Sequence, residues 1–139
     1  MNFFVFIAQE WILVSVLIAL VAIYYWRDRT KSGLPLTPNQ VIALLNQEVA
    51  IIVDLREPAD FRTGHILASL NVPYSRIISD SSELSAYKDK ILVLVDKLGQ
   101  HASAAGRKLA KEGYQVRRMS GGISEWQAQT LPLFRGKKS

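Results

Sequence analysis

The fold is decided by the stretch Lys90-Ile-Leu-Val-Leu-Val-Asp-Lys-Leu-Gly-Gln-His-Ala-Ser-Ala-Ala-Gly-Arg-Lys-Leu-Ala-Lys111, which has the pattern of a strand, a loop and a helix. Ile91–Val95 is an unbroken apolar run, typical of a strand that is covered on both faces. Residues 96–101 are polar around Gly99, and residues 102–112 favour a helix that a glycine ends. In α/β proteins such a loop is a common place for binding or chemistry.

The composition limits what the protein can do. The chain has 139 residues, which is enough for one domain and a short extension. It contains no cysteine, so disulfides, thiolate metal sites and a thiol nucleophile are excluded. Its two histidines lie far apart in sequence, and we expect no metal site and no cofactor. The net charge is +5, but no nucleic-acid motif accompanies it, and we expect no nucleic acid partner.

The beginning of the chain is strongly apolar. Residues 11–26 form the most continuously apolar stretch. As a helix with a rise of ~1.5 Å per residue they cover roughly 24 Å, and an extension to about 6–26 reaches the length of a full membrane span. Trp11 at one end and residues 24–26 at the other are aromatic, as at membrane interfaces. A cleaved signal peptide would begin with basic residues, and a core helix this apolar needs a larger protein around it. We therefore predict a transmembrane helix.

The flanking charges predict the orientation of this helix. Arg27, Arg29 and Lys31 follow it, whereas only Glu10 is charged before it. By the positive-inside rule, the protein is a single-pass protein of the bacterial inner (cytoplasmic) membrane with its carboxyl-terminal domain in the cytoplasm. The predicted segments are a short extracytoplasmic amino terminus at 1–10, the transmembrane helix at 11–26, a linker at 27–36, a domain at 37–132 and a basic tail at 133–139.

Apolar runs alternate with helical patterns along the rest of the chain. Strands are predicted at residues 50–54, 69–72, 91–95 and 115–119. Helices are predicted at residues 38–46, around Phe61, and at 74–78, 84–88, 102–112 and 123–129. This alternation predicts a single α/β domain in which a parallel sheet is flanked by helices.

Two separate motifs follow one another in this domain. The first contains Val53-Asp54-Leu55-Arg56-Glu57 and Phe61, then Gly64-His65-Ile66 and Asn71-Val72-Pro73. The second contains Gly121-Gly122-Ile123, Trp126 and Leu131-Pro132. In this order, with strands between them, they resemble the rhodanese-like domain family over residues 37–132. Ala68-Ser69 departs from the pattern, because the family usually has Gly-Ala there.

Several motif residues are expected to serve the fold rather than chemistry. They are Asp54, Arg56, Gly64, His65, Gly121, Gly122 and Trp126. The carboxylate and the guanidinium at the strand's end are expected to pair or to cap turns. The glycines suit positive φ angles or a close backbone approach. The histidine is expected to be a hydrogen-bonded structural residue, and the tryptophan a core residue.

The departure that bears on function is Asp96. The resemblance implies that active members have a cysteine here, which carries a persulfide, and that loop amides and the helix dipole stabilise the thiolate and an anionic substrate. A carboxylate cannot hold a persulfide, so we predict no catalytic residue, no sulfurtransferase activity and no related cysteine phosphatase activity. The degenerate active-site loop is Asp96, Lys97, Leu98, Gly99, Gln100, His101 and Ala102.

Two positions are open for the Asp96 side chain. Its carboxylate accepts the N–H groups of the loop and so plugs the site, or it faces solvent as an ordinary loop acid. A role as an acyl-phosphate nucleophile is disfavoured, because that chemistry needs Mg²⁺ and further carboxylates, for which Asp54 is the only obvious candidate. A small-anion site would use Lys97 and His101 with the loop amides, but Asp96 opposes it by like-charge repulsion.

These observations together predict a membrane-anchored, catalytically inactive domain that acts as a protein-interaction module. Its expected partners are the lipid bilayer and a membrane or membrane-associated protein. The basic residues Arg27, Arg29, Arg135, Lys137 and Lys138 would each contribute at most ~1 kcal/mol to contact with anionic lipid, or serve only topology and solubility. The alternatives are binding or sensing of a sulfur oxyanion or phosphate by the 96–102 loop, and an enzyme that is sulfurtransferase-like by fold only.

Overall fold

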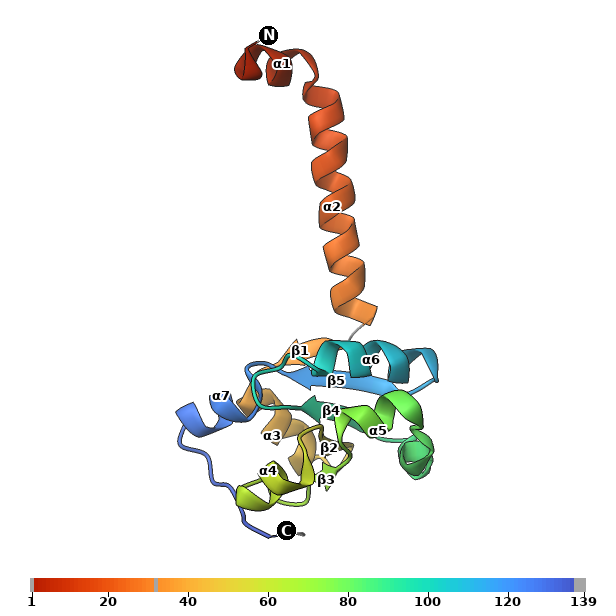
Figure 1. Cartoon of the computed structure of the whole chain (residues 1–139), viewed down its shortest axis with the longest axis vertical. Coiled ribbons are helices and arrows are strands. Elements are labelled where there is room, and N and C mark those ends of the chain that lie inside the picture. The colour runs from red at the N-terminus through yellow and green to blue at the C-terminus, as the bar shows by residue number, and fades with distance from the viewer. Residues whose placement is uncertain (1, 32, 137–139) are drawn as a thin grey trace. The chain divides into compact units, whose positions relative to one another are not determined.

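The structure divides into an amino-terminal helical unit and an α/β domain, with the boundary between Thr30 and Lys31 (Figure 1). It is a computed structural model that describes residues 2–31 and 33–136. The end of the predicted basic tail, with Lys137 and Lys138, lies outside the described residues.

The amino-terminal unit contains two helices, α1 (Phe3–Gln9) and α2 (Trp11–Lys31). The Asn2 side chain caps α1 by accepting the N–H of Phe4 at 3.2 Å. A continuous helix over residues 6–26 does not form, because α1 ends at the polar pair Gln9-Glu10 and the chain bends by 84° there. Among the described residues, no single helix has both the length and the apolar character of a membrane span, but α1 and residues 11–27 meet this test together as a bent pair.

The predicted linker at 27–36 is wrong at both ends. Helix α2 continues to Lys31, and strand β1 (Leu34–Leu36) pairs in parallel with β5 (Gln115–Met119). A three-residue Leu-Pro-Leu segment carries no local strand signal. Pro35 is tolerated because β1 is an edge strand, where one missing N–H leaves no neighbour unpaired.

The domain is built on a five-stranded parallel sheet in the order β1-β5-β4-β2-β3. Strands β2 (Ala50–Asp54) and β4 (Ile91–Val95) lie at its centre and pair in register, with Asp54 opposite Val95. The short edge strand β3 (Leu70–Asn71) pairs with β2. The four predicted strands are confirmed, but the one predicted at residues 69–72 is shorter, at Leu70–Asn71.

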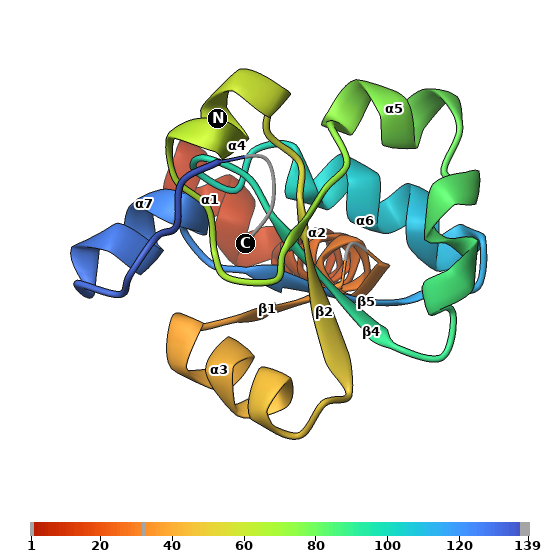
Figure 2. The ribbon, with the colours of Figure 1, turned by 90° about the horizontal axis from the view of Figure 1, so that it is seen from below.

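Helices cover both faces of this sheet (Figure 2). Helices α3 (Pro38–Asn46) and α7 (Gly122–Ala128) pack on one face, while α5 (Tyr74–Ser79), the 3-10 helix η1 (Ser82–Tyr87) and α6 (Ala102–Lys111) pack on the other. Strand β4 alternates between them, since Leu92 and Leu94 join the core under α6, and Val93 and Val95 join the core under α3 and α7. Helix α4 (Pro58–Thr63) follows the carboxyl end of β2. The predicted α/β architecture is confirmed.

Helix α7 is attached directly to the backbone at the end of β4. The N–H of Ile123 donates to the carbonyl of Asp96 at 2.8 Å, and the N–H of Ser124 donates to the carbonyl of Lys97 at 3.1 Å. Gly122, at φ +60°, permits this approach, because a Cβ there would overlap the carbonyl oxygen of Asp96. The close approach expected at this glycine is therefore present.

Replacing Gly122 with alanine is expected to lower the free energy of unfolding by more than about 2 kcal/mol, because a left-handed backbone conformation is combined with a backbone clash. Gly113 is the matched control: it also has a positive φ, but its Cβ would meet no atom within 4 Å, so Gly113→Ala should cost only about 1 kcal/mol. Urea unfolding of the full chain in detergent micelles, followed by the indole NMR signal of Trp126, measures both. Equal losses would contradict the proposed clash.

Ala68 adopts a left-handed conformation, at φ +61°, in the turn before β3. Ala68→Gly is therefore expected to stabilise the domain by about 0.5 kcal/mol, since relief of backbone strain exceeds the extra entropy of the unfolded glycine chain. In the exposed helical position 43, Ala43→Gly should instead destabilise it by about 1 kcal/mol. The same unfolding measurement compares them, and a loss of stability in both variants would argue against strain at Ala68.

Candidate functional site

The candidate site lies at the carboxyl edge of the sheet, between the end of β4 and the start of α6. The carboxyl ends of β2 and β4 meet there, and the N–H of Leu55 donates to the carbonyl of Val95 at 2.7 Å. A cavity of about 330 Å³ opens at this edge, lined by residues of the segments 55–60, 74–75 and 96–101. We call it the loop cavity. Its position is the usual one for ligand sites in parallel sheets.

The Asp96 side chain is turned into the loop. Only 3% of the residue is exposed. One carboxylate oxygen accepts the N–H of Gly99, and the other accepts the N–H of His101 at 2.6 Å. Gly99, at φ +96°, allows the loop to curl around the carboxylate. Of the two positions left open by the sequence, the structure has the plugged one, and these two amides are not available to a bound anion.

The other loop residues surround this plug in different ways. Lys97 and Gln100 are exposed, and 55% of Leu98 is exposed beside the cavity. The His101 ring stacks on Tyr74, with the ring centroids 4.5 Å apart and an angle of 24° between the rings. Ala102 is buried as the first residue of α6. The loop residues lie together, but His101 stacks on an aromatic ring and does not join Lys97 and the loop amides in an anion site.

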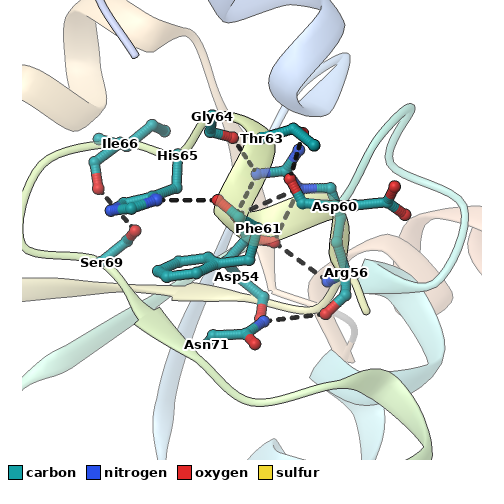
Figure 3. Close-up of polar contacts among 10 residues, drawn as sticks. All are labelled: Asp54, Arg56, Asp60, Phe61, Thr63, Gly64, His65, Ile66, Ser69 and Asn71. Carbon is teal, nitrogen blue, oxygen red and sulfur yellow. Dashed lines mark hydrogen bonds and ion pairs between the residues drawn. The ribbon is translucent and has the colours of Figure 1, made fainter. Parts of the chain in front are cut away.

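Asp54 and Arg56 form the pair that the first motif predicts (Figure 3). Arg56 Nη2 lies 2.8 Å from one carboxylate oxygen, and Nε donates to the other at 3.0 Å. The same Nη2 donates to the carbonyl of Gly64 at 2.6 Å, and the Asn71 amide donates to the carbonyl of Arg56 at 2.9 Å. Asp54 is 1% exposed, so this charge-assisted network ties α4 to the end of β2. It also engages the carboxylate that an acyl-phosphate mechanism would have needed beside Asp96.

His65 is buried and hydrogen-bonded within the domain. Its buried ring stacks on Phe61 at 3.9 Å between centroids, and Nδ1–H donates to the Phe61 carbonyl at 2.8 Å (Figure 3). Its backbone pairs in antiparallel fashion with Phe134, through bonds of 2.8 and 2.7 Å. Trp126 is a core residue whose indole N–H donates to the Pro132 carbonyl at 3.0 Å. The predicted end of the domain at 132 is therefore wrong, because the chain pairs with the fold beyond it.

Several residues of the loop cavity were not predicted from the sequence. Glu57, Asp60, Tyr74 and Ser75 all line it. The signal that identifies them is topological: they follow the ends of β2 and β3, and the carboxyl ends of parallel strands share one edge of the sheet. Among the described residues, no group of three or more histidine, aspartate or glutamate side chains is placed to hold a metal ion.

Asp96→Ala is expected to lower the free energy of unfolding by about 1–3 kcal/mol, because two loop N–H groups lose their acceptors. The amides of Gly99 and His101 should exchange with solvent faster, as measured by hydrogen exchange in NMR. Asp96→Asn, which keeps one oxygen acceptor, should lose less. Asp89, an exposed turn residue, supplies the control Asp89→Ala. Unchanged stability and exchange in Asp96→Ala would refute a role of the carboxylate in holding the loop.

Solved structures share this fold. A rhodanese-related protein from Thermoplasma volcanium is 24% identical and superposes with a TM-score of 0.65, covering 72% of this chain and 96% of that chain. A thiosulfate sulfurtransferase from Pseudomonas aeruginosa is 20% identical with a TM-score of 0.67, covering 76% of this chain and 21% of that larger chain.

Sequence relatives extend over most of the chain. The protein YibN of Escherichia coli (strain K12) is 35% identical over 123 residues, which are 87% of this chain and 86% of YibN. The protein BU052 of Buchnera aphidicola is 32% identical over 133 residues, which are 92% of each chain. The family model described as the rhodanese-like domain matches residues 37–129. The chain belongs to the rhodanese-like domain family.

Proposed function

We propose that this protein is a membrane-anchored, catalytically inactive rhodanese-like domain that binds a protein partner at the cytoplasmic face of a bacterial inner membrane. The observation that carries the proposal is the Asp96 carboxylate, which stands at the expected nucleophile position and accepts two N–H groups of its own loop. Two N–H groups of the loop are therefore engaged by the chain itself, and the chemistry of a carboxylate differs from that of a thiolate.

The loss of sulfur transfer follows from elementary chemistry. A persulfide forms when a thiolate takes a sulfur atom from a donor, and the chain contains no cysteine. A carboxylate oxygen cannot replace that sulfur nucleophile. The neighbouring Asp54 carboxylate is paired with Arg56, so it does not assist Asp96.

Binding is supported by what the domain has kept. The loop cavity is still open at about 330 Å³, and its surroundings are held by the Asp54–Arg56 network and by the docking of α7. A preformed pocket without a nucleophile is suited to recognition rather than turnover. Leu98, which is 55% exposed at its border, offers an apolar contact to a partner.

The membrane anchor is supported by the surface of the amino-terminal helices. Large apolar side chains on α2, such as Trp11, Leu17 and Ile18, are more than 60% exposed. A soluble protein rarely leaves such a surface in water, whereas a bilayer would cover it. The basic residues after position 26 then favour a cytoplasmic domain.

Binding of a small anion has less support. Two of the loop amides already donate to Asp96, and the carboxylate adds a negative charge where the anion would lie. An enzyme with sulfurtransferase-like activity has the least support, because the chain contains no thiol.

The proposal predicts a partner that contacts the loop cavity. A photo-crosslinking residue placed at Leu98 in the full chain, in native membranes, should give one reproducible protein adduct, identified by mass spectrometry. The control places the same crosslinking residue at position 39. Asn39 is exposed on α3, on the face of the sheet opposite to α6, and this position should not give the adduct. If neither position gives a reproducible adduct, the interaction role is refuted.

The proposal also predicts that the purified full chain transfers no sulfur from thiosulfate to cyanide. Its rate should equal that of Asp96→Ala, because neither protein has a thiol. Turnover above the rate of that variant would contradict catalytic inactivity.

A further inference from the structure

The loop cavity has the size and position of a site for one side chain. Its volume of about 330 Å³ lies at the low end of the roughly 300–1,000 Å³ that is typical of ligand pockets. One long side chain of a partner fits this description better than a broad protein surface does. The chemistry of its walls decides which side chain.

The charges that border the cavity favour a cation. Its lining contains two positive residues, Arg56 and Lys97, and three carboxylates. The positive charge of Arg56 is already paired with Asp54, at 2.8 Å. Three carboxylates and one ammonium group therefore remain in the lining, and this balance of charge favours a cation over an anion.

Two of these carboxylates have no partner of their own. Glu57 and Asp60 are exposed, and neither side chain makes a hydrogen bond or an ion pair with any residue that the structure describes. Figure 3 shows the Asp60 carboxylate directed away from the Asp54–Arg56 pair. The third, Asp96, is held by the loop N–H groups and contributes only its charge. The exposed pair is thus available to an incoming donor.

The remaining walls favour arginine over lysine. The stacked rings of Tyr74 and His101 border the cavity, and a planar guanidinium can stack on such rings. Arginine can also donate two parallel N–H bonds to a carboxylate, which an ammonium group cannot. Leu98, half exposed nearby, suits the aliphatic part of the side chain.

We propose that the loop cavity receives an arginine side chain of the protein partner, held between the carboxylates of Glu57 and Asp60 and the Tyr74–His101 stack. This inference rests on the proposed function and names the chemistry of the partner. The family resemblance implies an anionic ligand, whereas the ligand proposed here is a cation. The difference arises because Asp96 brings a negative charge into a loop whose amides would otherwise accept an anion.

A peptide titration tests this directly. The full chain in micelles of a non-ionic detergent is titrated with acetyl-Gly-Arg-Gly-amide, and backbone amides are followed by NMR. Saturable shifts are expected at Glu57, Tyr74 and His101. Acetyl-Gly-Lys-Gly-amide should bind more weakly, and acetyl-Gly-Glu-Gly-amide should cause no shifts there. Absence of shifts with the arginine peptide, or equal shifts with the glutamate peptide, would overturn the proposal.

A charge-matched pair of variants separates the site from general electrostatics. Glu57→Gln combined with Asp60→Asn should raise the Kd of the arginine peptide about three- to tenfold, as expected for the loss of two exposed ion pairs. Glu48→Gln combined with Asp89→Asn changes the net charge equally, at exposed positions before the amino ends of β2 and β4, and should change the Kd less than twofold. Equal weakening by both double variants would overturn the proposal.

The crosslinking experiment distinguishes this inference from the function on which it rests. The yield of the Leu98 adduct should fall several-fold in the Glu57→Gln, Asp60→Asn variant and stay within about twofold in the Glu48→Gln, Asp89→Asn variant. If the yield is unchanged in the first variant, the arginine site is refuted and the interaction role stands. If the parent chain gives no adduct, the proposed function fails, and this inference fails with it.

Discussion

The structure of the site depends on the hydrogen bonds of one residue, Asp96. Its carbonyl accepts the N–H of Ile123 and so holds helix α7 against the end of β4. Its carboxylate accepts the N–H groups of Gly99 and His101 and so sets the shape of the loop that leads into α6. Strand β4, helix α7 and the loop before α6 therefore meet at a single residue, which is 3% exposed.

The Asp96 carboxylate also affects the electrostatics of the cavity. Loop amides that converge at a helix amino end favour negative charge, and in this chain that negative charge is built in. Two of these amides donate to Asp96, and the exposed charged groups that line the cavity are the carboxylates of Glu57 and Asp60 and the ammonium group of Lys97. Because the chemistry of such a site depends on single residues of its loop, the fold by itself does not identify the activity.

Prediction from the sequence succeeded where local patterns are strong and failed where distant segments pair. The apolar run at Ile91–Val95 predicts a central strand, and the helix predicted at residues 38–46 is α3; both are confirmed. Strand β1 was missed because Leu-Pro-Leu is a strand only through its pairing with β5. The pairing of Phe134 with His65 was also missed, because it joins segments that are distant in sequence and no local pattern at either residue predicts it.

The sequence by itself determined the family, the absence of a thiol, the alternation of strands and helices and the apolar amino-terminal run, because each of these is a property of residue identity or local periodicity. Only the tertiary structure decided that the Asp96 carboxylate turns into its own loop, that His101 stacks on Tyr74, and that Glu57 and Asp60 border the same cavity. These are contacts between segments that parallel strand pairing brings to one edge of the sheet, and their geometry depends on the packing of the whole domain.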